Sequence, residues 1–404
     1  MTLASSTSPD RIGDYVLPGG WQVATIGELF ELQQGKALSA AARTAEERYP
    51  FLRTSNVLWG RVDLSSVDRM GMSETERSRL RLRDRDLLVC EGGEIGRAAV
   101  WHGEVDECYF QNHIHRLRAR DECVLPEFYC FWLQVAFTRL GIYEGAGTKT
   151  TIANLSGGRL SALKVPQPPL DDQARIVRIL AAINNSVDKG SISLSARQVT
   201  RNALATRLLG SPETNSEPYL FSDVVDVVSG QVDPRTEPFL SLPHIAPDNI
   251  ESGTGRLLPV KTAGELGLIS GKYQFQPGDI IYSKIRPYLN KATVAPFRGT
   301  CSADMYVLRA DETRLLQEFL FYLLLDDDFL QQAVSHQGRT GIPKINREQM
   351  NSISLRVPSL EFQSQIVRML KVADRFVESE RALIACSQSL FDAAIGPLMS
   401  GGSR

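Results

Sequence analysis

The fold is decided by a stretch that occurs twice, as LDDQARIVRILAAINNSVDKGSISLSARQVTRNALATRLL at residues 170–209 and as LEFQSQIVRMLKVADRFVESERALIACSQSLFDAAIGPLM at residues 360–399. The openings LDDQARIVRIL and LEFQSQIVRML are identical at six of eleven positions. A repeat of this length predicts that one structural unit is built twice along the chain.

Both stretches place apolar residues at steps of four and three, which is the spacing of a coiled-coil seam. The seam residues are Ile176, Leu180, Ile183, Val187 and Leu194 in the first stretch, and Ile366, Leu370, Val377 and Ile384 in the second. A helix of about 40 residues is about 60 Å long, which favours a spacer over a helix of one small domain. Two ordinary amphipathic helices buried in one core remain the alternative.

Composition limits the class of protein. The chain has 404 residues, enough for two or three domains, and its hydrophobic fraction of 43% is typical of a folded protein. Its longest apolar run, Phe319 to Leu325, is too short to cross a bilayer, so a cytoplasmic protein is expected. A net charge of −2 means that any DNA-binding surface must be local. Six cysteines without a C-x-x-C pair give no reason to expect a metal site.

The segments before the two long stretches also match. In each half an aspartate, Asp86 or Asp279, precedes an apolar strand, and a later strand ends in Leu-Arg-Ala. A helix is expected from about Thr25 to Gly35, and its counterpart has Ser222 as a candidate N-cap. The predicted domains are a flexible N-terminus at 1–17, mixed α/β domains at 18–168 and 217–358, and long helices at 170–209 and 360–399.

This order of segments resembles the specificity subunit of type I restriction-modification enzymes. The resemblance covers nearly the whole chain and is carried by the LPGGW entry, the turn LLVCEGGEIGRAAV, the loop GTKTTIANLS, and the duplicated VPQPPLDDQARIVRIL and VPSLEFQSQIVRML junctions. It implies an α/β (mixed α+β) fold with two similar target-recognition domains, separated by two long antiparallel coiled-coil helices in a pseudo-two-fold dumbbell.

The resemblance also implies partners. The two domains would read an asymmetric bipartite site in double-stranded DNA, and the helices, through the seam residues, would dock two methyltransferase (modification) subunits. The chain itself would hold no cofactor and no catalytic residue. S-adenosylmethionine would bind the modification subunit, and ATP and Mg would be needed only if a restriction subunit joins, which the sequence leaves open.

The first candidates for DNA contact lie in the loop before each long helix, where flexible backbone, positive charge and hydroxyl groups suit phosphates and groove edges. These residues are Thr148, Lys149, Thr150 and Asn154 in the first half, and Arg339, Thr340, Lys344 and Asn346 in the second. The two asparagines could instead cap the turn that follows. A solvated glycine-rich loop without DNA contact is the alternative for all of them.

The second candidates lie in the turn after the Asp-strand motif. Lys284, Arg286 and Lys291 outnumber the acids near them, whereas Arg97 has Glu94 and Glu91 as neutralising neighbours. Third come Arg53, Ser55 and Asn56, for which capping is an equally good explanation.

Three other patterns favour structural roles. The alternating arginines from Arg77 to Arg85 would lie on one strand face, but interspersed acids predict a salt-bridged surface. His113 and His115 have strand spacing without a third ligand, and Asp326 to Asp328 would cap a helix over 316–334 rather than hold a metal.

The sequence gives less support to two rival functions. A self-contained DNA-modifying enzyme lacks support, because Gln167-Pro168-Pro169-Leu170 departs from an Asn/Asp-Pro-Pro-aromatic loop at both ends and no G-x-x-x-x-G-K-[ST] phosphate loop occurs. A coiled-coil scaffold without base readout would leave both mixed domains and their basic loops without a role.

Overall fold

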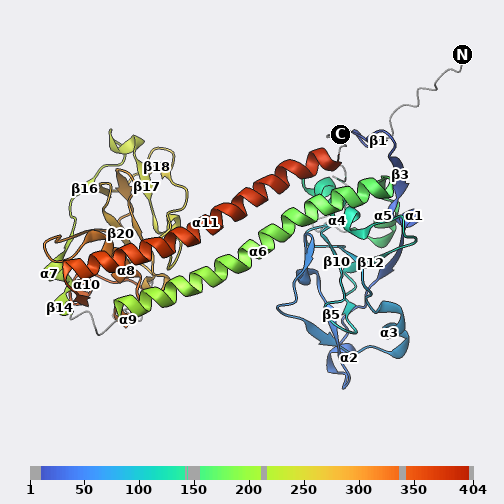
Figure 1. Cartoon of the computed structure of the whole chain (residues 1–404), viewed down its shortest axis with the longest axis horizontal. Coiled ribbons are helices and arrows are strands. Elements are labelled where there is room, and N and C mark those ends of the chain that lie inside the picture. The colour runs from blue at the N-terminus through green and yellow to red at the C-terminus, as the bar shows by residue number, and fades with distance from the viewer. Residues whose placement is uncertain (1–10, 142, 144–154, 211–215, 336–342, 400–404) are drawn as a thin grey trace, which may run out of the picture. The chain divides into compact units, whose positions relative to one another are not determined.

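The computed structural model describes residues 11–141, 143, 155–210, 216–335 and 343–399. It divides into unit 1, which contains Met1–Gly190 and Leu383–Arg404, and unit 2, which contains Ser191–Ala382. The long helices α6 (Leu170–Leu209) and α11 (Leu360–Met399) have the predicted bounds (Figure 1). Each helix gives one segment to each unit, so the units differ from the predicted domains.

Unit 1 is built on a four-stranded antiparallel sheet. Its strands are, in spatial order, β10 (Ala98–Val100), β9 (Leu87–Cys90), β12 (Ile114–Ala119) and β4 (Phe30–Gln34). A second sheet contains β11 (Tyr109–Phe110), β5 (Tyr49–Leu52) and β8 (Asp68–Met70), with β11 and β5 parallel. β3 (Gln22–Thr25) pairs with β13 (Lys164–Gln167), which leads into α6. The buried helix α4 (Pro126–Thr138) packs against β9 and β10.

Unit 2 repeats this topology. Its four-stranded sheet has the matching order β21 (Ala292–Val294), β20 (Ile280–Ser283), β23 (Met305–Ala310) and β15 (Val225–Val227). Its second sheet has the order β16 (Gln231–Val232), β19 (Lys272–Phe275), β22 (Gly299–Cys301), β17 (Pro243–Ile245) and β18 (Lys261–Thr262), with β17 and β22 parallel. β14 (Glu217–Leu220) pairs with β24 (Ser354–Val357), which leads into α11. The predicted duplication is confirmed.

Short elements complete each unit. Unit 1 adds β1 (Arg11–Ile12), β2 (Tyr15–Val16), α1 (Ile26–Leu29), α2 (Ala40–Thr44), β6 (Val57–Leu58), β7 (Arg61–Val62), α3 (Glu74–Leu80) and α5 (Gly157–Ala162). Unit 2 adds α7 (Phe221–Val224), α8 (Gln317–Leu325), α9 (Asp327–Ser335) and α10 (Arg347–Asn351).

The duplicated glutamine of the long stretches joins each helix to its domain. Gln173 is buried, accepts a hydrogen bond from Leu125 N at 3.0 Å, and donates to Cys123 O and Pro168 O, both at 2.9 Å. Gln363 repeats the arrangement in unit 2 with the backbone of Leu316, Arg314 and Pro358. A glutamine amide matches one donor and two acceptors that would otherwise be unpaired.

The repeated aspartates and the Leu-Arg-Ala arginines form a matching ion pair. Asp86 accepts two hydrogen bonds from Arg118, at 2.8 and 2.7 Å, and Asp279 accepts two from Arg309, at 2.7 and 2.9 Å. Both aspartates are at most 5% exposed, so each carboxylate depends on its arginine for charge compensation.

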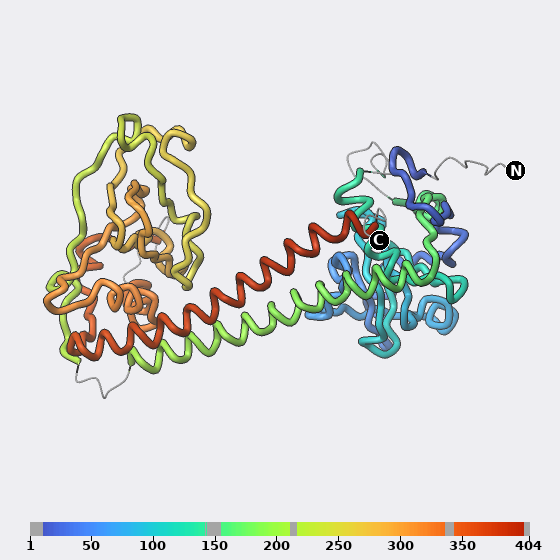
Figure 2. The backbone as a smooth tube through the Cα atoms, turned by 45° about the horizontal axis from the view of Figure 1, so that its top comes forward, coloured from blue at the N-terminus to red at the C-terminus, as the bar shows by residue number. Residues whose placement is uncertain are grey.

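The long helices complete the two cores. Ile176 and Leu180 of α6, with Phe391 and Ile395 of α11, belong to the core of unit 1. In unit 2 the two segments run antiparallel and side by side (Figure 2), because Arg197 pairs with Glu380 while Arg201 donates to Asp374 at 2.7 Å. α11 is long and apolar enough to span a membrane by length and composition alone, and 22% of its most apolar window is buried in the structure.

Two local predictions were wrong. Residues 11–17 of the predicted flexible N-terminus form the β1–β2 hairpin, and Ile12 and Leu17 are buried in the core. The helix expected from Thr25 to Gly35 lasts one turn, α1, which Thr25 and Glu28 cap, before β4 begins. Pairing of β4 with β12 overrides local helix propensity there, which a single sequence does not reveal.

The predicted N-cap and the predicted helix over 316–334 also need correction. α7 begins after Leu220, whose N–H donates to Asp223, so Ser222 lies inside the turn. Asp326 ends α8, and α9 starts at Asp327.

A buried histidine predicts acid sensitivity in unit 2. His244 is 3% exposed, and burial, followed by nearby Lys272, lowers its pKa to about 4. Because unfolding returns the pKa to about 6.5, the stability from neutral His244 is complete above pH 6.5 and is lost as pH falls towards 4, by about 3 kcal/mol.

Hydrogen exchange of peptides covering β17 and β22 should therefore accelerate between pH 6.5 and 4, after correction for intrinsic exchange rates. His244→Gln should flatten that dependence. The same slope in wild type and variant would contradict the assignment.

Candidate nucleic-acid interface

The two candidate regions predicted from sequence meet at one place in each unit, the end of the central strand. In unit 1, Glu91 follows β9; its N–H donates to His113 O at 2.9 Å, and its carbonyl accepts from Leu155 N at 2.8 Å. In unit 2, Lys284 does the same with Asp304 O at 2.8 Å and Ile345 N at 3.0 Å. The loop that precedes each long helix is therefore anchored beside the strand turn.

Several predicted contacts cannot be placed. Thr148, Lys149, Thr150, Asn154, Arg339 and Thr340 lie outside the described residues. Their loops end at the anchors Leu155 and Ile345.

The turn of unit 2 has an unusual backbone. Arg286 and Asn290 have φ of 48° and 44°, in the left-handed region. Arg286 N donates to Pro343 O at 2.7 Å, and Ile285 forms an isolated bridge with Lys344. These contacts join the turn directly to the end of the loop.

The cations of unit 2 differ in their availability. Lys284 is 9% exposed, donates to Ala303 O at 2.8 Å and lies over the Tyr306 ring; burial, then Lys344, lowers its pKa. Lys291 donates to Pro247 O at 2.8 Å. Arg286 is exposed, and Lys344 has a half-exposed side chain 3.8 Å from Asp304. Only Arg286 and Lys344 of these four residues present their charge outward.

The matching turn of unit 1 carries glycines and acids. Gly93 and Gly96 occupy its left-handed positions, with φ of 78° and 77°. Arg97 is held inside by the Thr54 carbonyl and by Glu94 at 3.5 Å. Its side chain is 18% exposed, so it braces the turn and offers little surface to a ligand.

Unit 1 also brings together Glu91, the predicted structural histidines and Gln34, which the sequence did not single out. Gln34 of β4 donates to Glu91 at 3.2 Å and to Asn112 O at 2.9 Å. Exposed His113 and buried His115 each lie 3.9 Å from the Glu91 carboxylate, and burial lowers the pKa of His115. Aligning Glu91 with Lys284 after the repeated strands could have identified this position.

The described asparagine candidates mainly bond to nearby backbone groups and cap a helix or turn. Asn346 exchanges two 2.9 Å hydrogen bonds with Gln349 at the start of α10. Asn56 is buried and bonds to the backbone of Arg53, Asp63 and Ser66. The side chain of Arg53 pairs with Asp68.

The alternating arginines do not form a strand face, since Arg77 and Arg79 lie in α3. A salt-bridged surface is present as predicted, but its acids are not the interspersed ones: Arg77 and Arg81 contact Glu107, and Arg85 contacts Glu127.

The predicted seam residues are covered by the chain itself. Ile176, Leu180, Ile366, Leu370 and Val377 are buried, and Ile183, Val187, Leu194 and Ile384 are half-buried. Another subunit that docks on α6 and α11 would therefore contact other side chains of these helices before the seam residues.

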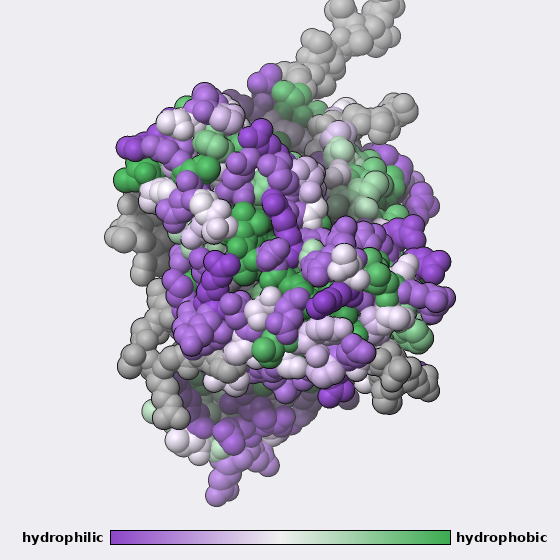
Figure 3. All heavy atoms as spheres, turned by 90° about the vertical axis from the view of Figure 1, so that its left-hand side faces the viewer, coloured by the Kyte–Doolittle hydropathy of each residue, from purple (hydrophilic) through white to green (hydrophobic). Residues whose placement is uncertain are grey.

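A different apolar row faces outward on α11. We call it the α11 stripe; its members in unit 2 recur every seven residues and are Phe362, Met369 and Phe376, exposed by 38, 51 and 56%. Spacing of seven keeps them on one helix face. The face of unit 2 shown in Figure 3 is mostly hydrophilic, with small apolar areas between hydrophilic residues.

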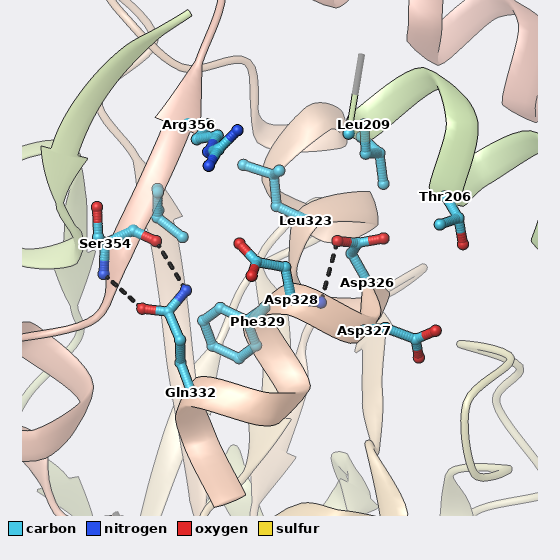
Figure 4. Close-up of a pocket in the computed structure, with 12 residues that line it drawn as sticks. Thr206, Leu209, Leu323, Asp326, Asp327, Asp328, Phe329, Gln332, Ser354 and Arg356 are labelled. Atoms are coloured by element: carbon cyan, nitrogen blue, oxygen red, sulfur yellow. Dashed lines mark hydrogen bonds between the residues drawn. The ribbon is translucent and has the colours of Figure 1, made fainter. Parts of the chain in front are cut away.

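Figure 4 shows a hollow in unit 2 that is lined by acidic side chains. Asp326 accepts from Asp328 N at 3.2 Å, and burial raises the pKa of Asp326. Gln332 and Ser354 exchange two hydrogen bonds of 3.1 Å. The Asp326 carboxylate therefore caps the start of α9, and in the described part of the chain no three His, Cys, Asp or Glu side chains gather as metal ligands.

The sequence profile of the type I restriction modification DNA specificity domain matches residues 18–193 and 255–385. The chain belongs to this family. It is a non-catalytic specificity subunit of a type I restriction-modification system. Its matched segments cover the first mixed domain, the second mixed domain from residue 255 onward, and parts of both long helices, which are the features duplicated in the structure.

Similar proteins agree. The chain is 40% identical over 392 residues to the EcoDI specificity subunit of Escherichia coli, covering 88% of this chain and 81% of the relative. The EcoKI specificity subunit of Escherichia coli strain K12 is 29% identical over 192 residues, covering 45% of this chain and 41% of the relative. The solved S subunit of M. genitalium has a TM-score of 0.61 at 14% identity, covering 98% of both chains, which shows a shared fold.

Proposed function

We propose that each unit reads one half of an asymmetric bipartite site in double-stranded DNA. The reading surface of each unit is the end of its central strand, β9 or β20, together with the loop anchored there. One observation carries the proposal: the same backbone anchor holds different chemistry in the two units, Glu91 with Gly93 in one and Lys284 with Arg286 in the other. The two units have the same backbone geometry at this place but different side chains, which suits the reading of two different half-sites.

Within this surface, Arg286 and Lys344 are the described cations that reach outward, so they are the proposed DNA contacts of unit 2. Thr148, Lys149, Thr150 and Asn154, with Arg339 and Thr340, remain proposed contacts from the loops. A supporting role within the turns and loops is proposed for the candidates whose side chains bond to the chain itself, which are Lys284, Lys291, Arg97 and Asn346.

The proposed protein partners are two modification subunits, which supply the methyltransferase chemistry and hold S-adenosylmethionine. A solved relative with a TM-score of 0.57 comes from work on complex assembly and conformational transition of the type I system. The α11 stripe is the proposed docking surface, since exposed apolar side chains at seven-residue spacing fit a helix of another subunit. ATP and Mg would be needed only if a restriction subunit joins this complex, and the complex would act in the cytoplasm.

Methylation mapping tests the function. Genomic DNA from cells that express this chain with its modification subunits should carry a split, asymmetric methylated motif, and deletion of this chain should remove it. Sequence-independent binding that is insensitive to salt would instead favour a scaffold.

A domain exchange tests the division of labour. Residues 18–168 should be replaced by the matching residues of the EcoDI specificity subunit, with α6 retained. Gln173 would then bond the backbone groups of the replacement that correspond to Cys123, Leu125 and Pro168. Only one half of the methylated motif should change. A change in both halves, or a folded and active exchange with an unchanged motif, would contradict one reader per unit.

A further inference from the structure

The two strand turns adopt left-handed backbone at matching places, but only one of them does so with glycine. In unit 1 the residues are Gly93 and Gly96, and in unit 2 they are Arg286 and Asn290. Glycine takes this conformation without steric cost, whereas a residue with a Cβ is strained there. Unit 2 therefore has a strained arginine, Arg286, at the position where the matching turn of unit 1 has the unstrained Gly93.

For Asn290 the structure shows a local reason. Asn290 is 5% exposed and donates from Nδ2 to Leu325 O at 3.1 Å, which ties the turn to the end of α8. The Arg286 side chain has no comparable bond: among the described residues, its guanidinium has neither a carboxylate nor a carbonyl partner. The backbone of Arg286 is strained although its side chain stabilises nothing within the described residues, and such strain is typical of a residue that contacts a ligand.

The backbone of Arg286 is held firmly. Its N–H donates to Pro343 O at 2.7 Å, its carbonyl accepts from Leu289 N at 2.9 Å, and Pro287 follows it. Lys284 and Lys291 turn inward onto carbonyls beside it, and Asp304 pairs with Lys344 instead. The result is one exposed guanidinium on a firmly held backbone.

We propose that Arg286 is the specificity-determining residue of unit 2 and reads a guanine, on either strand, in the major groove of its half-site. An arginine guanidinium can donate two parallel hydrogen bonds to guanine O6 and N7, which no other base pair edge matches. Gly93 leaves the first half-site without this reader. The inference rests on the proposed function, because it requires that unit 2 contacts DNA at this turn.

The test uses the complete complex with its modification subunits and compares Arg286→Gly, Arg286→Lys and Lys344→Ala. Arg286→Gly installs the residue of unit 1, so unit 2 should unfold no more readily than in wild type. One guanine position in one half of the methylated motif should nevertheless relax, with discrimination falling about 10- to 100-fold. Arg286→Lys keeps the charge but not the paired donors, so it should retain binding better than glycine while losing discrimination at the same position.

Lys344→Ala is the matched control for charge. It should weaken binding to all sequences alike, reduce the salt dependence by about one counterion, and leave the motif unchanged. The inference is overturned if Arg286→Gly preserves every preference in the motif, if it weakens all sequences equally, or if the half-site read by unit 2 contains no G·C pair. If the wild-type complex yields no bipartite motif, the proposed function itself fails, which is a separate outcome.

Discussion

Replacing Gln363 by leucine should lower the free energy of unfolding of unit 2 by about 3–5 kcal/mol, because it leaves three backbone groups without their partner. Gln363 is fully buried and lies where α11 leaves β24, so water cannot readily replace its amide. Leucine has a similar volume, and the loss therefore reports hydrogen bonding rather than a cavity. Gln173→Leu should have the same effect in unit 1, where the geometry is repeated.

The matched control is Gln331→Leu, at an exposed position of α9 in the same unit, which should change stability by less than about 0.5 kcal/mol. Hydrogen exchange of peptides from β20 and β23 measures the loss for unit 2 separately from unit 1. Equal effects of Gln363→Leu and Gln331→Leu would show that the duplicated glutamine is not the joint between helix and domain.

Replacing Phe376 by aspartate should lower the affinity for the modification subunit at least about 30-fold and suppress methylation by the complex. Phe376 is 56% exposed, so the protein alone should fold normally, whereas a carboxylate buried in a helix–helix contact would be unpaired. The neighbouring Arg197, whose guanidinium lies 5.8 Å from the ring centroid, is already paired with Glu380. Co-purification and methylation of a site-bearing duplex measure the two expected losses.

Ile269→Asp makes the same kind of change at a 77% exposed position of unit 2 outside the helices, and it should leave assembly intact. Normal assembly and methylation by Phe376→Asp would eliminate the α11 stripe as the docking surface, without affecting the assignment of the DNA-binding turns.

The separation between successful and failed predictions follows the range of the interactions. The bounds of α6 and α11 were predictable, since they depend on a periodic apolar pattern that short windows contain. The helix predicted after Thr25 failed because β4 gains its hydrogen bonds from β12, more than 80 positions later in the chain. The N-terminal hairpin was missed for a similar reason, since its Tyr15 hydroxyl donates to Met399 O at the far end of the chain.

The candidate site shows the same division. The cations in SKIRPYLNK gave three candidates, but in the folded chain Lys284 and Lys291 donate to carbonyls and Arg286 is exposed. The seam residues were recognised as apolar and periodic, but their spacing could not distinguish packing within the chain from contact with a partner. The α11 stripe has the same periodicity and is exposed.

The amino-acid sequence by itself determined that this chain is built twice, that each copy ends in a 40-residue helix, and that a glutamine, an aspartate and an arginine recur at matching places. Only the tertiary structure decided that the glutamine joins helix to domain, that the aspartate and arginine pair, and that Arg286 alone occupies a strained, outward-facing position on the matching frame. The physical reason is that periodicity and repetition are local properties of a chain, whereas burial and hydrogen-bond partners depend on residues brought together by folding.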